Sequence, residues 1–115
     1  MPGQDFMDGG LTIQDSIFIS KELQNAGVDI LNISSGIGGW RRPGERRGEG
    51  YLVEEASIIQ ANIQIPVIGV GGIETGDYID DLISQNKITL AAVGRAILKD
   101  PKQWGIKQLR SNCHV

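Results

Sequence analysis

Two apolar runs that lead into glycine contain the residues of this sequence best suited to bind a ligand. Residues 66–73 include the pair Gly71-Gly72, and residues 90–95 end in Gly94-Arg95. Glycine lets the backbone approach a ligand closely with its N–H groups as donors, and a guanidinium can bind two phosphate oxygens at once. If the two runs are neighbouring parallel strands, their carboxyl ends meet, and these four residues would form a phosphate cradle.

Each of these features also has an interpretation that needs no ligand. Gly71-Gly72 could be a tight turn from a strand into a helix, and Arg95 could pair with the carboxylate of Asp100. Trp40 lies in a long glycine-rich segment, residues 35–49, with arginines beside it. It is either part of a lid over a ligand or the aromatic anchor of a mobile surface loop.

The sequence around the two runs predicts strands and helices in alternation. Strands are expected over residues 28–34, from Pro66 onward, and from about residue 88 to Arg95. Helices are expected from Thr12 to Gly27, over about 52–61, after an N-cap at Thr75, and over about 101–109. Alternation of this kind predicts an α/β fold with parallel strands and right-handed crossovers.

Length, composition and charge limit the classes of protein that this chain can represent. The 115 residues, 40% of them hydrophobic and 22% charged, fit one globular domain over 1–115. A net charge of −3 argues against a nucleic-acid partner or an anionic membrane surface. The charged segments are expected to be solvated: a basic stretch interleaved with acids (Arg41, Arg42, Arg46, Arg47, Glu45, Glu49) and the acidic helix positions (Glu54, Glu55, Asp80, Asp81).

The single cysteine and the lack of long apolar segments predict a cytoplasmic protein. Cys113 has no second cysteine to pair with, so a reducing compartment is expected. The first twenty residues have no basic start followed by an apolar stretch, and no window reaches the roughly 20 apolar residues that cross a bilayer. We therefore expect no membrane partner.

Several short motifs follow one another in a characteristic order along the chain. They are Gly10-Leu11-Thr12 before a helix, Ala26-Gly27-Val28-Asp29 leading to Ser34-Ser35-Gly36, and the two glycine-containing runs extended to residues 65–73 and 93–101. In order and spacing these motifs resemble the old yellow enzyme family of flavin oxidoreductases. The family is an eight-stranded (β/α) barrel, or TIM barrel, that carries FMN, takes hydride from NADH or NADPH, and reduces activated alkenes.

The resemblance implies that this chain is the C-terminal three βα units of such a barrel. Gly71 and Gly72 would then offer backbone donors to the FMN phosphate, and Gly94 and Arg95 would hold it from the last strand. This agrees with the usual phosphate position in (β/α)8 barrels. A complete barrel needs about 250 residues, and the family's substrate-binding histidines and tyrosine proton donor lie in the first five units. We therefore assign no catalytic residue and no metal ligand to this chain.

Two functions remain open from the sequence. The first is the C-terminal fragment of an FMN-dependent NAD(P)H oxidoreductase of the ene-reductase type. The second is a non-catalytic half-barrel that binds phosphate or a nucleotide. A three-stranded unit would expose two sheet edges and an apolar face. Either way, we expect a homo-oligomer or a complementary chain as partner.

Overall fold

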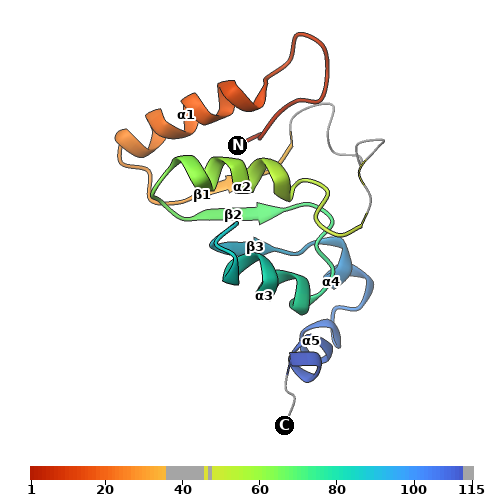
Figure 1. The fold of residues 1–115 in the computed structure, drawn as a ribbon. Coiled ribbons are helices and arrows are strands. Elements are labelled where there is room, and N and C mark those ends of the chain that lie inside the picture. The colour runs from red at the N-terminus through yellow and green to blue at the C-terminus, as the bar shows by residue number, and fades with distance from the viewer. Residues whose placement is uncertain (36–45, 47, 113–115) are drawn as a thin grey trace.

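The predicted strands form one parallel sheet in the structure of this protein, a computed structural model (Figure 1). The structure describes residues 1–35, 46 and 48–112, without the side chains of 110–112. Its three strands, β1 (Leu31–Ile33), β2 (Val67–Val70) and β3 (Leu90–Ala92), lie side by side in chain order. Both pairings are parallel, which confirms the α/β class and the expected strand direction. Each strand is shorter than expected, because regular pairing stops before the flanking residues.

The first helices begin where their capping residues predict. Helix α1 (Ile13–Asn25) opens with a capping box, in which Thr12 Oγ1 accepts from Asp15 N at 3.2 Å and Asp15 Oδ2 accepts from Thr12 N at 3.0 Å. Gly27, at φ +98°, ends this helix. Helix α2 (Val53–Asn62) lies one residue from the expected range.

The third helix is also capped as predicted, although its buried face is narrower than expected. Helix α3 (Gly76–Ser84) follows Thr75, whose Oγ1 accepts from Tyr78 N at 3.3 Å. Of its apolar residues, Leu82 is buried and Ile79 packs against the core. The helical spacing of Ile79, Leu82 and Ile83 predicts that this helix buries all three, but Ile83 is 40% exposed.

Two helices follow β3, and the second starts later than predicted. Helix α4 (Arg95–Lys99) begins directly after Gly94, and α5 (Trp104–Asn112) is the last helix. Pro101 was expected to be the first residue of that helix, but residues 101–103 form a turn. The turn is close to helical, since Trp104 N donates to Asp100 O at 3.0 Å, four residues back.

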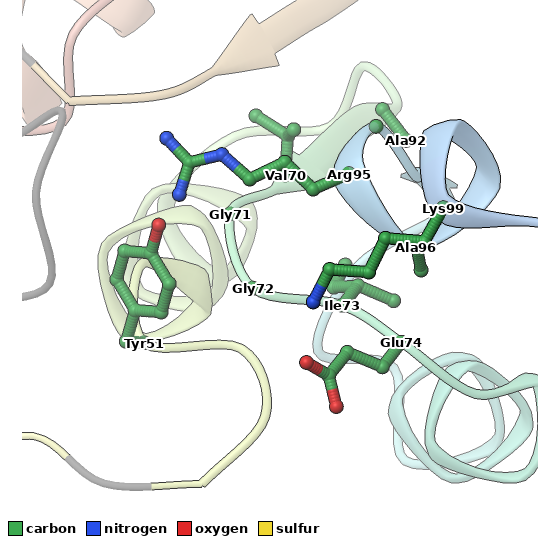
Figure 2. Close-up of a pocket in the computed structure, with 11 residues that line it drawn as sticks. Tyr51, Val70, Gly71, Gly72, Ile73, Glu74, Ala92, Arg95, Ala96 and Lys99 are labelled. Carbon is green, nitrogen blue, oxygen red and sulfur yellow. The ribbon is translucent and has the colours of Figure 1, made fainter.

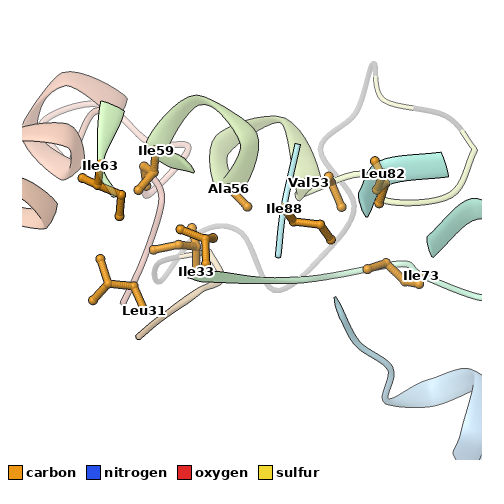
Figure 3. Close-up of a cluster of buried hydrophobic side chains, with 10 residues drawn as sticks. Leu31, Ile33, Val53, Ala56, Ile59, Ile63, Ile73, Leu82 and Ile88 are labelled. Carbon is orange, nitrogen blue, oxygen red and sulfur yellow. The ribbon is translucent and has the colours of Figure 1, made fainter. Parts of the chain in front are cut away.

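The apolar core lies between the sheet and the helices that cover one of its faces. In Figure 3, Ala56 and Ile59 of α2 face Ile33, with Leu82 of α3 at one end of the cluster. Four of the core residues are fully buried: Ile33, Ala56, Ile59 and Val67. Helix α1 packs against α2, farther from the sheet (Figure 1).

The opposite face of the sheet has no helix over it in the described part of the chain. The register aligns Asn32, Ile68 and Leu90, and side chains at aligned positions of a sheet share a face. Asn32 is exposed and Leu90 is 48% exposed, whereas Leu31 and Ile33, on either side of Asn32, are buried. Ile30, which alternates with Leu31, is 40% exposed. Among the described residues there is also no helix of the length and apolarity that a membrane span requires.

A buried ion pair corrects the expectation that Arg46 and Glu55 are solvated. Glu55 is only 2% exposed, and its carboxylate accepts hydrogen bonds from Arg46 Nη1 at 2.8 Å and Gln4 Nε2 at 2.7 Å. The guanidinium also lies over the Phe6 ring, 5.1 Å from its centroid. Through these contacts the N-terminal segment is held against α2. The other members of the basic stretch, Arg41, Arg42 and Arg47, and Glu45 lie outside the described residues.

The remaining acidic helix positions behave as predicted. Glu54, Asp80 and Asp81 are exposed. Burial alone would raise the pKa of Glu55, but the hydrogen bonds from Arg46 and Gln4 outweigh it and hold that pKa below its ordinary value of 4.5. The folded state therefore holds the Glu55 proton less tightly than the unfolded chain does.

We expect Glu55→Gln to destabilise the fold by about 2 kcal/mol at pH 7, because the Arg46 guanidinium loses its buried carboxylate partner, although it keeps the exposed Glu54, 3.3 Å away. The ion pair contributes fully to the free energy of unfolding above the ordinary glutamate pKa of 4.5. This contribution is lost as the pH falls through the lower pKa that Glu55 has in the folded state. Denaturant unfolding at pH 7 and across this acid range measures both effects. The neighbouring Glu54→Gln is the variant for comparison: Glu54 also pairs with Arg46, but its side chain is 66% exposed, so its loss should cost much less. Equal losses in the two variants would contradict this role of Glu55.

Candidate functional site

A cavity of about 340 Å³ lies at the carboxyl ends of β2 and β3. Val70 and Ala92 are Cα partners in the sheet, so the residues that follow them emerge at the same edge. All four residues of the predicted cradle line this cavity, together with seven others (Figure 2): Tyr51, Val70, Ile73, Glu74, Ala92, Ala96 and Lys99. The structure therefore brings Gly71, Gly72, Gly94 and Arg95 together.

Glycine is required twice in the turn after β2. Gly71 has φ +113° and Gly72 has φ +72°, a region that residues with a Cβ rarely adopt. A Cβ at Gly71 would lie 2.6 Å from Leu52 Cδ1, and a Cβ at Gly72 would lie 2.3 Å from Tyr51 Cδ1. Backbone conformation and close packing thus both exclude a side chain at these positions.

This turn offers a row of backbone donors to the cavity. Within residues 1–35, 46 and 48–112, the N–H groups of Gly71, Gly72 and Ile73 make no hydrogen bond outside the regular pairing of the sheet. Consecutive N–H groups in a turn make a concave site for an anion, because an unpaired donor gains most from a negatively charged acceptor. The wall formed by β2 and its turn is therefore suited to phosphate or carboxylate oxygens.

The residues after β3 form a second wall of the cavity, and their backbone conformation differs from that of the turn after β2. Gly94 has φ −109°, outside the left-handed region that favours glycine, and a Cβ there would meet no described atom within 4 Å. Packing within the chain therefore does not require glycine at position 94. The prediction that Gly94 lets a ligand approach the backbone closely can be tested only with a ligand bound. Arg95 follows it as the first residue of α4 and is exposed.

Cations predominate among the charged side chains that line the cavity. Arg95 and Lys99 are four residues apart on α4, and Glu74 is the acid. In Figure 2 the side chains of Arg95 and Lys99 both extend back from α4 toward the turn after β2. Residues four apart lie on the same face of a helix, so the two cations can act on one ligand.

The structure does not support an ion pair between Arg95 and Asp100, which was the alternative to ligand binding by Arg95. Asp100, its suggested partner, instead pairs with Lys107, whose Nζ lies 2.6 Å from Asp100 Oδ2. No carboxylate in the described part of the chain lies within 4.0 Å of the Arg95 guanidinium. The guanidinium is therefore available to a ligand in the cavity.

Three side chains of this cavity were not predicted as site residues from the sequence: Tyr51, Glu74 and Lys99. Lys99 could have been found, because a helix after Gly94 puts it on the same face as Arg95. Tyr51 gave no such signal, because its segment reaches the turn through tertiary contacts, among them the hydrogen bond from Gly50 N to Gly72 O at 2.9 Å. The suggested lid residue Trp40, and Cys113 and His114, lie outside the described residues. No group of three His, Cys, Asp or Glu that could hold a metal occurs among the residues that are described.

Comparison with known proteins finds similarity to two kinds of nicotinamide-linked enzyme. The chain is 32% identical over 114 residues to a protein named NADH oxidase from Thermoanaerobacter brockii, a match that covers 87% of this chain and 16% of that protein. It is 33% identical over 97 residues to a protein named NADPH dehydrogenase from Bacillus velezensis, with 84% of this chain and 28% of that protein covered. No protein-family model matches the chain.

The chain thus spans less than a third of the length of either relative. What those proteins do as whole molecules therefore depends on much more sequence than is present here. The similarity supports a link with NAD(P)H oxidoreductases and extends over most of this chain.

We expect Gly72→Ala to lower the free energy of unfolding by about 2 kcal/mol, because the new Cβ is strained at φ +72° and collides with Tyr51. Gly94→Ala is the matched control on the other wall and should cost less than about 1 kcal/mol. Denaturant titration of both variants measures the difference. If Gly72→Ala is as stable as Gly94→Ala, the described conformation of the turn is wrong.

Proposed function

We propose that this chain is the C-terminal part of an FMN-dependent NAD(P)H oxidoreductase of the old yellow enzyme family, and that it supplies the strands that bind the flavin phosphate. The observation that carries the proposal is the convergence of the ends of β2 and β3 on one cavity. One wall of this cavity presents backbone N–H donors, and the other presents Arg95 and Lys99. Similarity to proteins named NADH oxidase and NADPH dehydrogenase supports the same class of reaction.

The residues of the cavity suit a phosphate monoester. The N–H groups of Gly71, Gly72 and Ile73 would donate to its oxygens from one side, and the Arg95 guanidinium would bind two oxygens from the other. Gly94 leaves room beside Arg95, because a side chain there would project into open space. Lys99 adds a second positive charge, which favours the doubly charged phosphate of FMN.

The fold is compatible with this assignment. A parallel sheet with strands in chain order and helices over one face is the arrangement of consecutive βα units in a (β/α)8 barrel. In such barrels the phosphate site commonly lies after the seventh and eighth strands. We therefore propose that β2 and β3 correspond to these two strands.

The proposed task of this chain is binding and orientation. When bound, FMN supplies the ring that accepts a hydride from NADH or NADPH and passes it to an activated alkene. By fixing the phosphate, Arg95 and the turn after β2 would hold the ring in one position relative to its substrates. In the proposed barrel, the proton donor and the substrate contacts come from its first five βα units, so no catalytic role is assigned to any residue here.

The uncovered face of the sheet is the second part of the proposal. In the complete barrel this face would point into the interior, where side chains from all the strands pack together. A chain that has only these strands leaves Ile30, 40% exposed, and Leu90, 48% exposed, in contact with water. We therefore propose that the isolated 115-residue chain buries this face against a second copy.

Arg95→Ala should weaken FMN binding by about tenfold or more, because a charge-assisted, bidentate contact to the phosphate is lost. Quenching of flavin fluorescence during titration with the 115-residue chain measures the affinity. Lys102→Ala is the control, since Lys102 is exposed and does not line the cavity. Unchanged affinity in Arg95→Ala would remove this residue from the site. Binding of inorganic phosphate without binding of FMN would instead favour a phosphate-binding half-barrel.

Light scattering after size exclusion should give the isolated chain a mass of more than one copy. Leu90→Asp should shift the chain toward the monomer, because it puts a charge on the uncovered face of the sheet. Met7→Asp is the control, since Met7 is 55% exposed and lies away from the sheet, in the loop before α1. A wild-type chain that remains monomeric as its concentration rises would refute the association.

A further inference from the structure

The turn between β2 and α3 is held from outside by the segment that precedes α2. Glu49 Oε1 accepts hydrogen bonds from Glu74 N at 2.6 Å and Thr75 N at 2.7 Å. Its second oxygen, Oε2, accepts from Thr75 Oγ1 at 2.8 Å. The next residue, Gly50, donates from its N–H to Gly72 O at 2.9 Å. One carboxylate thus fixes the last part of the turn, and the adjacent amide fixes its middle.

Helix α5 holds the same turn from another direction. Trp104 Nε1 donates to Glu74 O at 2.8 Å, and Gln108 Oε1 accepts from Gly76 N at 2.8 Å. The polar backbone groups at the end of the turn are therefore engaged by α5 and by Glu49. The donors at its beginning, on Gly71, Gly72 and Ile73, are the ones left for a ligand.

We propose that Glu49 is a positioning residue for the anion site, which it serves by holding the turn so that the N–H groups of Gly71, Gly72 and Ile73 line the cavity. This inference rests on the proposed function, since it takes the cavity to be the phosphate site. Glu49 itself is not among the residues that line the cavity. It acts through the backbone of Glu74 and Thr75, which follow the donors directly in the chain.

The charge of Glu49 argues that its role is geometric. A carboxylate near a phosphate weakens binding through repulsion, so electrostatics alone would disfavour a glutamate at this position. Its oxygens accept hydrogen bonds from two backbone amides and a hydroxyl. Because these bonds are made to a charged group, they hold the backbone of the turn firmly. Thr75 is also the N-cap of α3, so Glu49 couples the start of that helix to the turn.

The surroundings of Glu49 restrict its movement. Tyr78 packs so closely that a Cβ on Gly50 would lie 2.0 Å from the Tyr78 oxygen. Burial raises the pKa of Tyr78, and the negative charge of Glu49 raises it further. The segment from Glu49 to Gly50 is thus held between α3 and the turn.

Two substitutions separate hydrogen bonding from charge. Glu49→Ala removes all of the side-chain acceptors, whereas Glu49→Gln keeps an oxygen that can accept from both amides and adds an N–H that can donate to Thr75 Oγ1. Glu49→Ala should raise the dissociation constant for FMN about tenfold, and Glu49→Gln should bind as tightly as the wild type or more tightly. Glu22→Ala, at an exposed position on α1, is the matched control and should leave binding unchanged.

A ligand-free measurement makes the test independent of flavin binding. Hydrogen exchange at the amides of Glu74 and Thr75, followed by NMR in the 115-residue chain, should accelerate in Glu49→Ala and stay near the wild-type rate in Glu49→Gln. The amide resonances of Gly71 and Gly72 should shift in the alanine variant only. If these signals are the same in Glu49→Ala and the wild type, the proposal is overturned.

The two readouts distinguish this inference from the proposed function. A wild-type chain that binds neither FMN nor inorganic phosphate refutes the proposed function, while the exchange rates still decide whether Glu49 holds the turn. If the wild type binds FMN and Glu49→Ala binds it equally well, the positioning role is refuted. Equal weakening in Glu49→Gln and Glu49→Ala would also refute it, because the amide restores the hydrogen bonds.

Discussion

The parallel register between β2 and β3 is the constraint on which the rest of the site depends. Val70 and Ala92 are paired, so the two strands end side by side at the same edge of the sheet. Gly71-Gly72 follows the first of these residues, and Gly94-Arg95 follows the second after one intervening valine. A shift of the register, or antiparallel pairing, would separate the backbone donors from the guanidinium. The helices on one face matter to function because they hold these strands in place.

Much of this arrangement could be predicted because it depends on local signals. Thr12 with Asp15, and Thr75, identify where helices begin, since their side chains satisfy N–H groups that a helix leaves unpaired. Apolar runs separated by helices indicate parallel strands, and this pairing brings the four predicted cradle residues together. The assignment of that cradle to FMN comes from the family resemblance and remains a proposal.

Other features could not be read from the sequence because they depend on residues that meet only in the folded chain. Glu55 follows Glu54 and has no local signal of burial, yet it is 2% exposed because Arg46 and Gln4 reach it from other segments. Glu49 looked like one acid in a charged loop, and its role depends on Thr75, which lies 26 positions along the chain. The start of α5 was placed at Pro101 because proline suits a first helical position, but residues 101–103 form a turn.

The most direct test of a single anion site at the ends of β2 and β3 is an NMR titration of the 115-residue chain with inorganic phosphate. We expect the amide signals of residues 71–73 and 94–96 to shift together, along one binding curve, while those of α1 stay unchanged. Shifts confined to one of these two segments, or binding curves that differ between them, would contradict it.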